Sequence, residues 1–250
     1  MKARLLALFS AVLCSVPAWA AEPAMNRKVD LDGDGKPEAV TLKWHEDKGS
    51  FTLQVGGATF ASPETGLQGG ALDVVDLLEG GDKWKEVAVS SGFTDGDKRI
   101  FLFGFDGKAI KPLGEVHSLG EVKGNGIVLS QIWMGFWNRT EKYALDRKTW
   151  SVRRVPQPLY YVGKLARVKQ SFPLAHSRED TTAIANLAPG TTIEVLAASV
   201  PERGGEPVHY LIKSATGLLG WTGQGPLTTQ TEGLPFAGPS PVVDGSPSTR

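Results

Sequence analysis

The sequence predicts an all-β protein. Short segments with period-two alternation, or with β-branched and aromatic enrichment, recur along the chain. Turn signals such as Asp106-Gly107 and Asn125-Gly126 separate them. The 30 Gly and 16 Pro among 250 residues favour many turns, and helical periodicity is nearly absent. We therefore expect an N-terminal antiparallel β domain, either partly propeller-like or a sandwich, followed by a small β-barrel.

The expected strands of the N-terminal domain are bounded by these turns, and most alternate apolar and polar residues. They are Glu38 to Trp44, Ser50 to Val55, Ala71 to Leu78, Lys85 to Ser90, Arg99 to Phe105, Ile127 to Trp133, Lys142 to Leu145 and Trp150 to Val155. Pro156 and Pro158 interrupt the pattern, because neither can donate a ladder hydrogen bond. This interruption predicts a domain that covers residues 21–158.

A second set of five short strands follows the two prolines. They are Leu165 to Lys169, Thr182 to Leu187, Thr192 to Ala197, Tyr210 to Ser214 and Leu218 to Thr222. Five short strands within so few residues fit a small barrel over 159–227. The remainder, 228–250, is rich in Pro, Gly, Ser and Thr, and its composition predicts a disordered tail.

The first twenty residues are predicted to be a secretory signal peptide rather than part of the fold. A positive start is followed by an apolar run from Leu5 to Leu13 that is too short to span a bilayer, with small residues at Ala18 and Ala20. Cleavage is expected after Ala20. Lipidation at Cys14 and an uncleaved membrane anchor are the alternatives, and the location expected for the mature chain is the periplasm or the medium.

Composition excludes several classes of function. The chain has 27 basic and 27 acidic residues, so it lacks the clustered positive charge that nucleic-acid binding requires. Its single cysteine lies inside the predicted signal peptide, so the mature chain has neither a disulfide nor a catalytic thiol. After cleavage no apolar stretch approaches transmembrane length.

One loop carries a specific chemical pattern. Carboxylates alternate along it, Gly35 allows a sharp turn, and the Lys36 carbonyl falls at the seventh position. Calcium takes six to eight oxygen ligands, and alternate residues of a tight loop can face one centre. The predicted ligands are Asp30, Asp32, Asp34, Lys36 and Glu38, with Ca²⁺ in a structural role. An EF-hand would have Glu at the twelfth position, which is Thr41 here. The alternative is a solvated turn that binds nothing.

The segment DLDGDGKPEAVTL resembles the calcium-binding segment of FG-GAP (integrin-α-like, VCBS-type) repeats. The resemblance implies a β-propeller fold with roles in adhesion and ligand binding. At about 50 to 60 residues a repeat, only about two blades fit. A second acidic loop runs from Asp76 to Glu86, but Leu78 takes the place of the second Asp. We expect weak or absent metal binding there.

The second domain is similar to bacterial SH3 (SH3b) domains, through KLARVKQSFPLAH, NLAPGTTIEVL and GLLGWTGQ. The similarity implies an SH3-like β-barrel that ends at Gly220-Trp221, with a role in binding cell-wall peptides or proteins. The first loop, Ala175 to Asp180, lacks the asparagine and arginine usual in that family. This difference weakens the expectation of cell-wall recognition.

Aromatic side chains offer candidate ligand platforms, because Trp provides a large and rigid contact area. The candidates are Trp133, Phe136, Trp137 and Trp221. Core or interdomain packing explains the first three equally well, and a place in the barrel core is the alternative for Trp221.

These observations favour an exported, non-enzymatic binding or scaffold protein of the bacterial cell envelope, with a cell-wall peptide or an envelope protein as partner. The alternative is a secreted cell-wall hydrolase that uses a carboxylate pair in the N-terminal domain. A cleft holding two carboxylates about 5 to 10 Å apart would favour the hydrolase.

Overall fold

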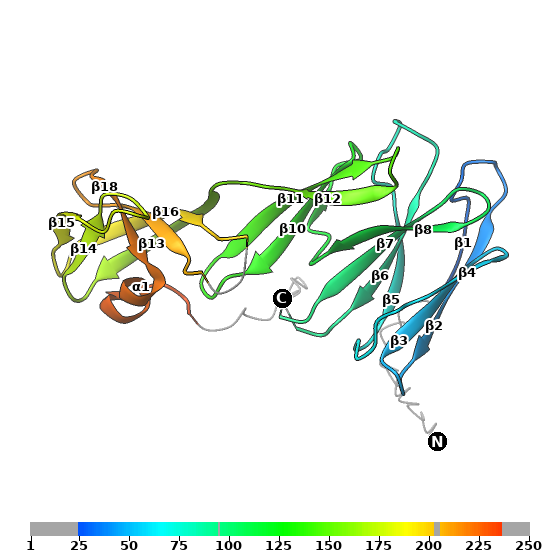
Figure 1. Cartoon of the computed structure of the whole chain (residues 1–250), viewed down its shortest axis with the longest axis horizontal. Helices are drawn as coiled ribbons and strands as arrows, with labels where there is room; N and C mark the ends of the chain where they lie inside the picture. The colour runs from blue at the N-terminus through cyan, green and yellow to red at the C-terminus, as the bar shows by residue number, and fades with distance from the viewer. Residues whose placement is uncertain (1–24, 95, 203–205, 237–250) are drawn as a thin grey trace, which may run out of the picture.

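A computed structural model describes residues 25–94, 96–202 and 206–236, shown in Figure 1. The predicted signal peptide, 1–20, and the end of the predicted tail, 237–250, lie outside the described residues. The all-β prediction is confirmed, since strands make up most of the described chain and its one helix is short. No helix of the described part is long and apolar enough to cross a membrane.

Three four-stranded antiparallel sheets form the first part of the chain, each with its strands in sequence order. The first sheet holds β1 (Asn26–Val29), β2 (Glu38–His45), β3 (Ser50–Val55) and β4 (Ala58–Ala61). The second holds β5 (Ala71–Val75), β6 (Glu86–Ser91), β7 (Arg99–Phe105) and β8 (Ile110–Val116). The third holds β9 (Glu121–Val122), β10 (Ile127–Trp133), β11 (Asn138–Asp146) and β12 (Ser151–Val155).

The number of sheets corrects one expectation. Each sheet occupies fewer residues than the 50 to 60 expected of a repeat, so three sheets fit where about two were predicted. The strands are joined by tight turns that need little chain. Gly107, for example, adopts a φ of +87° in the β7–β8 turn.

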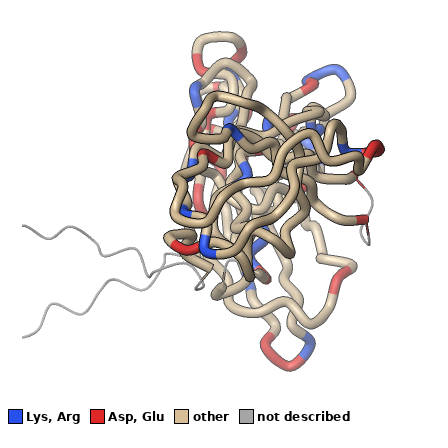
Figure 2. Tube along the Cα trace, turned by 90° about the vertical axis from the view of Figure 1, so that its left-hand side faces the viewer, with Lys and Arg blue, Asp and Glu red and all other residues tan. Residues whose placement is uncertain are grey.

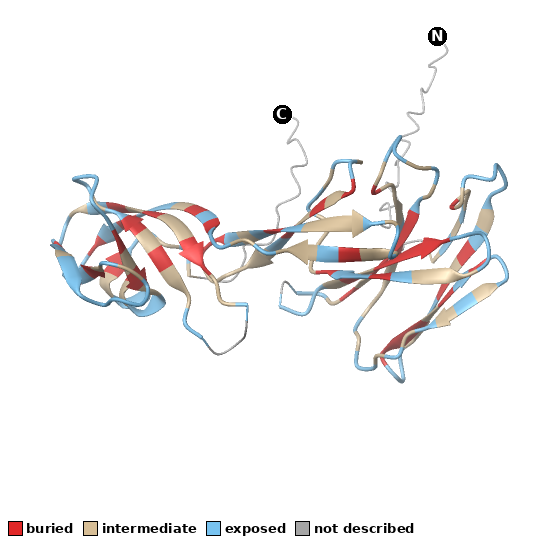
Figure 3. Cartoon of the chain, turned by 45° about the horizontal axis from the view of Figure 1, so that its top comes forward, coloured by how far each residue is buried: buried red, intermediate tan, exposed pale blue. Residues whose placement is uncertain are grey.

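The second sheet is buried on both faces, which ties the three sheets together. Val87 and Val89 of β6 pack into a core shared with the first sheet, whereas Ala88 packs into a core shared with the third. On β7, Phe103 packs into the core shared with the first sheet and Leu102 into the core shared with the third. This alternation follows from the period of two along a strand, and Figure 3 shows the buried residues running through the middle strands. The three sheets therefore form one layered unit.

A seven-stranded sheet forms the second part of the chain, in the order β15-β14-β18-β17-β16-β13-β19. Its strands are β13 (Tyr160–Val168), β14 (Phe172–Ala175), β15 (Ala183–Leu187), β16 (Thr192–Ser199), β17 (His209–Lys213), β18 (Leu219–Gly223) and β19 (Thr231–Glu232). No sheet of the described residues closes on itself. The observed architecture is therefore a set of open antiparallel sheets.

The disordered tail predicted for 228–250 starts too early in the chain, because the first residues of that range are ordered. Helix α1 (Gln224–Gln230) runs through position 228, and β19 then pairs with β13. Leu227 is fully buried and Thr231 is buried beside it, where its hydroxyl donates to the Leu227 carbonyl. These two side chains hold the segment against the sheet despite its polar composition. The second part of the fold therefore extends to residue 236.

Basic and acidic residue positions are interspersed along the Cα trace on the side of the molecule seen in Figure 2, in keeping with the equal numbers of basic and acidic residues.

Candidate metal centre

The acidic loop joins β1 to β2, and Asp30 organises its turn. One Asp30 oxygen accepts a hydrogen bond from the Gly33 N–H at 2.7 Å, and the other accepts from the Gly35 N–H at 2.9 Å. Both glycines have left-handed φ angles, +67° and +87°, which side-chain-bearing residues rarely adopt. The two glycines thus let the chain wrap around one carboxylate.

The next two carboxylates repeat the pattern at alternate positions. Asp32 Oδ1 accepts from the Asp34 N–H at 3.0 Å, and Asp34 Oδ1 accepts from the Lys36 N–H at 2.7 Å. The Lys36 ammonium lies 3.8 Å from Asp34 Oδ2, and its side chain is 86% exposed. Because an ammonium has no lone pair to offer a cation, the backbone carbonyl is the only candidate ligand atom of Lys36, and this part of the prediction stays a prediction.

Glu38, the first residue of β2, closes the loop. Its Oε2 accepts from the N–H of Leu31 at 2.8 Å, and Leu31 is fully buried in the core between the first two sheets. The Leu31 carbonyl accepts from the N–H of Lys85, the residue before β6 of the second sheet, at 2.9 Å. The loop is therefore fixed to both sheets at Leu31, between two of the acids.

Four of the five predicted ligands come together. Asp30, Asp32, Asp34 and Glu38 each place one carboxylate oxygen within 4.8 Å of the others. Each carboxylate has about four lone-pair directions, so the backbone hydrogen bonds leave acceptor capacity for a cation. Four hard oxygens, with a carbonyl and water, suit the six to eight ligands of calcium. Without a cation, the four anions repel one another.

A turn of the second sheet lies directly against this cluster. A Cβ atom at Gly107 would sit 2.6 Å from Asp32 Oδ2, and the φ of +87° at Gly107 is strained for any other residue. The neighbouring Asp106 accepts from the Ala109 N–H and pairs with Lys111, and these contacts lower the pKa of Asp106 to about 2. Asp106 holds the turn that shields one side of Asp32.

The second acidic loop, between β5 and β6, repeats the same framework. Leu77 is fully buried, and its N–H donates to Glu86 Oε2 at 2.9 Å. Its carbonyl accepts from the N–H of Gly126, in the β9–β10 turn of the third sheet. These contacts correspond to those of Leu31 and Glu38 in the first loop. The two loops are therefore structurally equivalent where each meets the next sheet.

A guanidinium occupies the second loop. Arg147, from the β11–β12 turn, donates to Asp82 Oδ2 and to Glu86 Oε1, both at 2.7 Å. Its Cζ lies 5.3 Å from the Trp84 ring and 5.0 Å from the Trp150 ring, at distances where a cation is attracted to an aromatic face. Glu86 is fully buried, and this burial raises its pKa although Arg147 and the Leu77 N–H oppose the shift. The second loop thus has a cation from the protein itself.

The backbone at Trp150 is strained to complete this arrangement. Its φ is +48°, a left-handed value that is uncommon for a bulky residue. The ring packs onto Gly104 of β7, where a Cβ would lie 2.7 Å from the Trp150 Cε3 atom. It also packs edge-on against Trp84 at a centroid distance of 5.5 Å. Packing therefore holds Trp150 in a conformation that its own backbone disfavours.

The aromatic candidates near β10 divide between the core and its margin. Phe136 and Trp137 are 0% and 1% exposed, and both belong to the core of the seven-stranded sheet. Their rings lie 5.4 and 6.5 Å from that of Tyr210. Trp133 is half-buried at the end of β10. The β10–β11 turn therefore inserts two aromatic side chains into the second part of the fold.

Trp221, the remaining aromatic candidate, is half-buried on β18, where it pairs with Leu211. The Arg178 guanidinium lies 5.7 Å from its ring centroid and donates to the Ser199 hydroxyl at 2.7 Å. One ring face of Trp221 is therefore occupied by a side chain of this protein.

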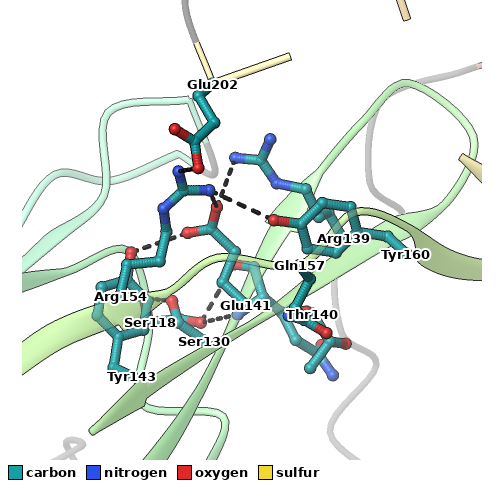
Figure 4. A network of polar contacts seen from close by, with 11 residues as sticks. Ser118, Ser130, Arg139, Thr140, Glu141, Tyr143, Arg154, Gln157, Tyr160 and Glu202 are labelled. Carbon is teal, nitrogen blue, oxygen red and sulfur yellow. Dashed lines mark hydrogen bonds and ion pairs between the residues drawn. The ribbon is translucent and has the colours of Figure 1, made fainter. Parts of the chain in front are cut away.

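A polar network connects the third sheet to the seven-stranded sheet, as Figure 4 shows. Glu141 of β11 is buried and pairs with Arg139 at 3.1 Å and with Arg154 at 3.2 Å. Tyr143 donates to the same carboxylate at 2.8 Å, and its burial raises the pKa of its hydroxyl. Arg154 also reaches Glu202, beyond β16, at 3.2 Å. The network thus pairs two arginines with two glutamates between the third sheet and the seven-stranded sheet.

Comparison of the chain with models of protein families, with curated proteins and with solved structures gives no match.

Proposed function

We propose that the chain is an exported binding protein of the bacterial cell envelope, with an N-terminal β part stabilised by Ca²⁺ and an SH3b-like module that binds cell-wall peptide or protein. The export step is expected to remove residues 1–20. The observation that carries the metal part is the convergence of four carboxylates within 4.8 Å on a loop anchored to two sheets. The module rests on the resemblance around Gly220-Trp221.

Calcium has a structural role in this proposal. The acidic loop lies where the first sheet meets the second, because Leu31 bonds to Lys85 and Asp32 lies against Gly107. A cation that neutralises the loop would strengthen this contact by removing repulsion among the acids. We therefore propose that the metal stabilises the platform and that ligands bind elsewhere on the molecule.

The hydrolase alternative has one pocket in its favour, a groove of about 210 Å³ whose lining includes Glu64 and Glu115. Both carboxylates are paired with Arg99, which lies between them. A catalytic acid or base must reach the substrate, whereas both of these carboxylates are engaged in ion pairs with one guanidinium. The pairing in this groove therefore favours a binding protein over a hydrolase.

Calcium is expected to raise the melting temperature of the chain. With an extracellular-type affinity of about 0.1 mM, millimolar Ca²⁺ contributes roughly 1.4 kcal/mol to stability. That contribution corresponds to a shift of about 3 to 5 °C. Asp32→Ala should abolish the shift, since it removes a central carboxylate. Thermal unfolding with Ca²⁺ and with excess chelator measures both effects.

Asp47→Ala is the matched control, because Asp47 is exposed in the β2–β3 turn and outside the cluster. This variant should keep the full calcium shift. Identical melting of the parent chain in Ca²⁺ and in chelator would refute the metal site.

A further inference from the structure

A pocket of about 440 Å³ lies at the junction between the third sheet and the seven-stranded sheet. Its walls come from β10 and β11 on one side and from β13 on the other, with the connecting segment between them. Its lining includes Asn138, Thr140, Lys142, Gln157, Tyr161 and Lys164. Its volume is that of a small-ligand site.

One wall is a row of polar side chains on β11. Asn138, Thr140 and Lys142 alternate along the strand, are exposed and share a face. Gln157, from the connecting segment, donates from Nε2 to the Thr140 carbonyl at 3.2 Å, which fixes its amide beside this row. An amide, a hydroxyl and an ammonium therefore follow one another along the wall.

The pocket carries positive charge. Lys142 and Lys164 lie on opposite walls, and no carboxylate lines the pocket. Among the described residues neither lysine has an ion-pair partner in the structure. Glu141, which directly precedes Lys142, is on the other face of β11 and is already paired with two arginines. The two ammonium groups are therefore available to an anion.

Tyr161 adds an aromatic surface at the rim. Tyr161 is 77% exposed, and its ring lies against the backbone of Gly163. A Cβ at Gly163 would lie 2.6 Å from Tyr161 Cε1, and Gly163 has a φ of +61° at a β-bulge in β13. The bulge and the glycine therefore hold one face of the ring against the backbone and leave the other open to solvent.

We propose that this pocket binds an acidic saccharide, a sugar ring that carries a carboxylate. The two lysines would form charge-assisted hydrogen bonds with the carboxylate. The amides and Thr140 match sugar hydroxyls, and the open Tyr161 face matches the apolar face of a sugar ring. The inference rests on the proposed envelope-binding function and adds a saccharide site to the module that binds peptide or protein. It places recognition at the junction of the two parts of the fold.

The test is an NMR titration of the full chain with N-acetylmuramic acid, and with N-acetylglucosamine as the uncharged match. Resonances of the pocket residues should shift saturably with the acidic sugar. The dissociation constant for the neutral sugar should be at least about tenfold higher. Lys142→Gln combined with Lys164→Gln should remove this preference. Tyr161→Ala should weaken the binding of both sugars.

Lys43→Gln is the control, because Lys43 is exposed on β2 and outside the pocket. It should bind as the parent does. No saturable shift at the pocket, equal affinity for both sugars, or unchanged binding by the double lysine variant would each overturn the inference.

Sedimentation with intact peptidoglycan separates the two proposals. If the chain sediments with peptidoglycan but fails the titration, the pocket assignment falls and the envelope function stands. If the titration succeeds and the chain does not sediment, the pocket assignment stands and the envelope function falls.

Discussion

Replacing Arg147 with alanine is expected to lower the free energy of unfolding by about 3 to 5 kcal/mol. Arg147 is the cation of the second acidic loop, bonded to Asp82 and to the fully buried Glu86. Its removal leaves Glu86 buried without its guanidinium partner. It also takes away the cation between the Trp84 and Trp150 rings. Chemical denaturation of the two proteins measures the difference.

Two comparisons make this prediction specific. Arg153→Ala is the matched control, since Arg153 is exposed on β12 and bonds only to the nearby Ser151 hydroxyl. It should change stability by less than about 0.5 kcal/mol. Adding Glu86→Gln to the Arg147→Ala variant should restore part of the loss, because a neutral amide costs less to bury than a carboxylate.

The loss should also shrink in acid. Burial raises the pKa of Glu86 in the folded chain above its ordinary value of 4.5, and removing Arg147 should raise that pKa further. A carboxyl with a raised folded pKa holds its proton more tightly when folded, so stability rises as pH falls through the window from the folded to the unfolded pKa. A loss below 1 kcal/mol at neutral pH, or one that does not depend on Glu86, would contradict the role of Arg147.

Trp137→Ala is the second substitution with a large expected effect, a loss of about 3 to 5 kcal/mol. Trp137 is 1% exposed and packs edge-on against Tyr210 of β17. Its neighbour Phe136 contacts the same ring and that of Phe236. Because the β10–β11 turn supplies both aromatic groups, the cavity opens in the core of the seven-stranded sheet. The variant should therefore loosen the attachment of the two parts.

Trp133→Ala serves as the comparison for Trp137→Ala, because Trp133 is half-buried and outside that core. Trp133→Ala should lower the free energy of unfolding by clearly less than Trp137→Ala does. Equilibrium unfolding gives the size of each loss, and limited proteolysis near the connecting Pro156-Gln157-Pro158 segment reports whether the junction opens. Equal losses for the two tryptophans, with an unchanged cleavage rate, would show that the inserted turn does not join the parts.

Strand positions with strong local patterns were predictable from the sequence. Ser50–Val55, Arg99–Phe105 and Ile127–Trp133 appear with the expected bounds. Their β-branched and aromatic residues, and the glycine turns that flank them, act over a few neighbouring residues. Local signals of this kind are sufficient for the all-β assignment.

The missed strands have weak local signals. β8 contains Pro112 and β14 contains Pro173, and proline lowers the expectation of a strand. The structure accommodates Pro112 on an edge strand, next to a register shift in the β7–β8 pairing. β14 pairs with β18 only at Ala175, and Pro173 pairs with Asn186 of β15 just before a register shift in that ladder. Both prolines therefore lie next to irregularities in their ladders, where strand proline is tolerated.

The two acidic loops show what sequence reasoning can reach at a site. The acidic cluster of the first loop was predictable because its carboxylates lie close together in the chain, and the structure brings Asp30, Asp32, Asp34 and Glu38 together. The role of Arg147 was not predictable, because Arg147 lies far along the chain in the β11–β12 turn and no local motif marks it. The fold alone places its guanidinium in the second loop.

We propose one calcium site per chain, in the first acidic loop, because the Arg147 guanidinium already occupies the second. Isothermal titration of the full chain with Ca²⁺ counts the sites. We expect one site per chain, with the binding heat lost in Asp32→Asn and retained in Asp47→Ala. No binding at millimolar Ca²⁺, two sites per chain, or one site that persists in Asp32→Asn would contradict the account.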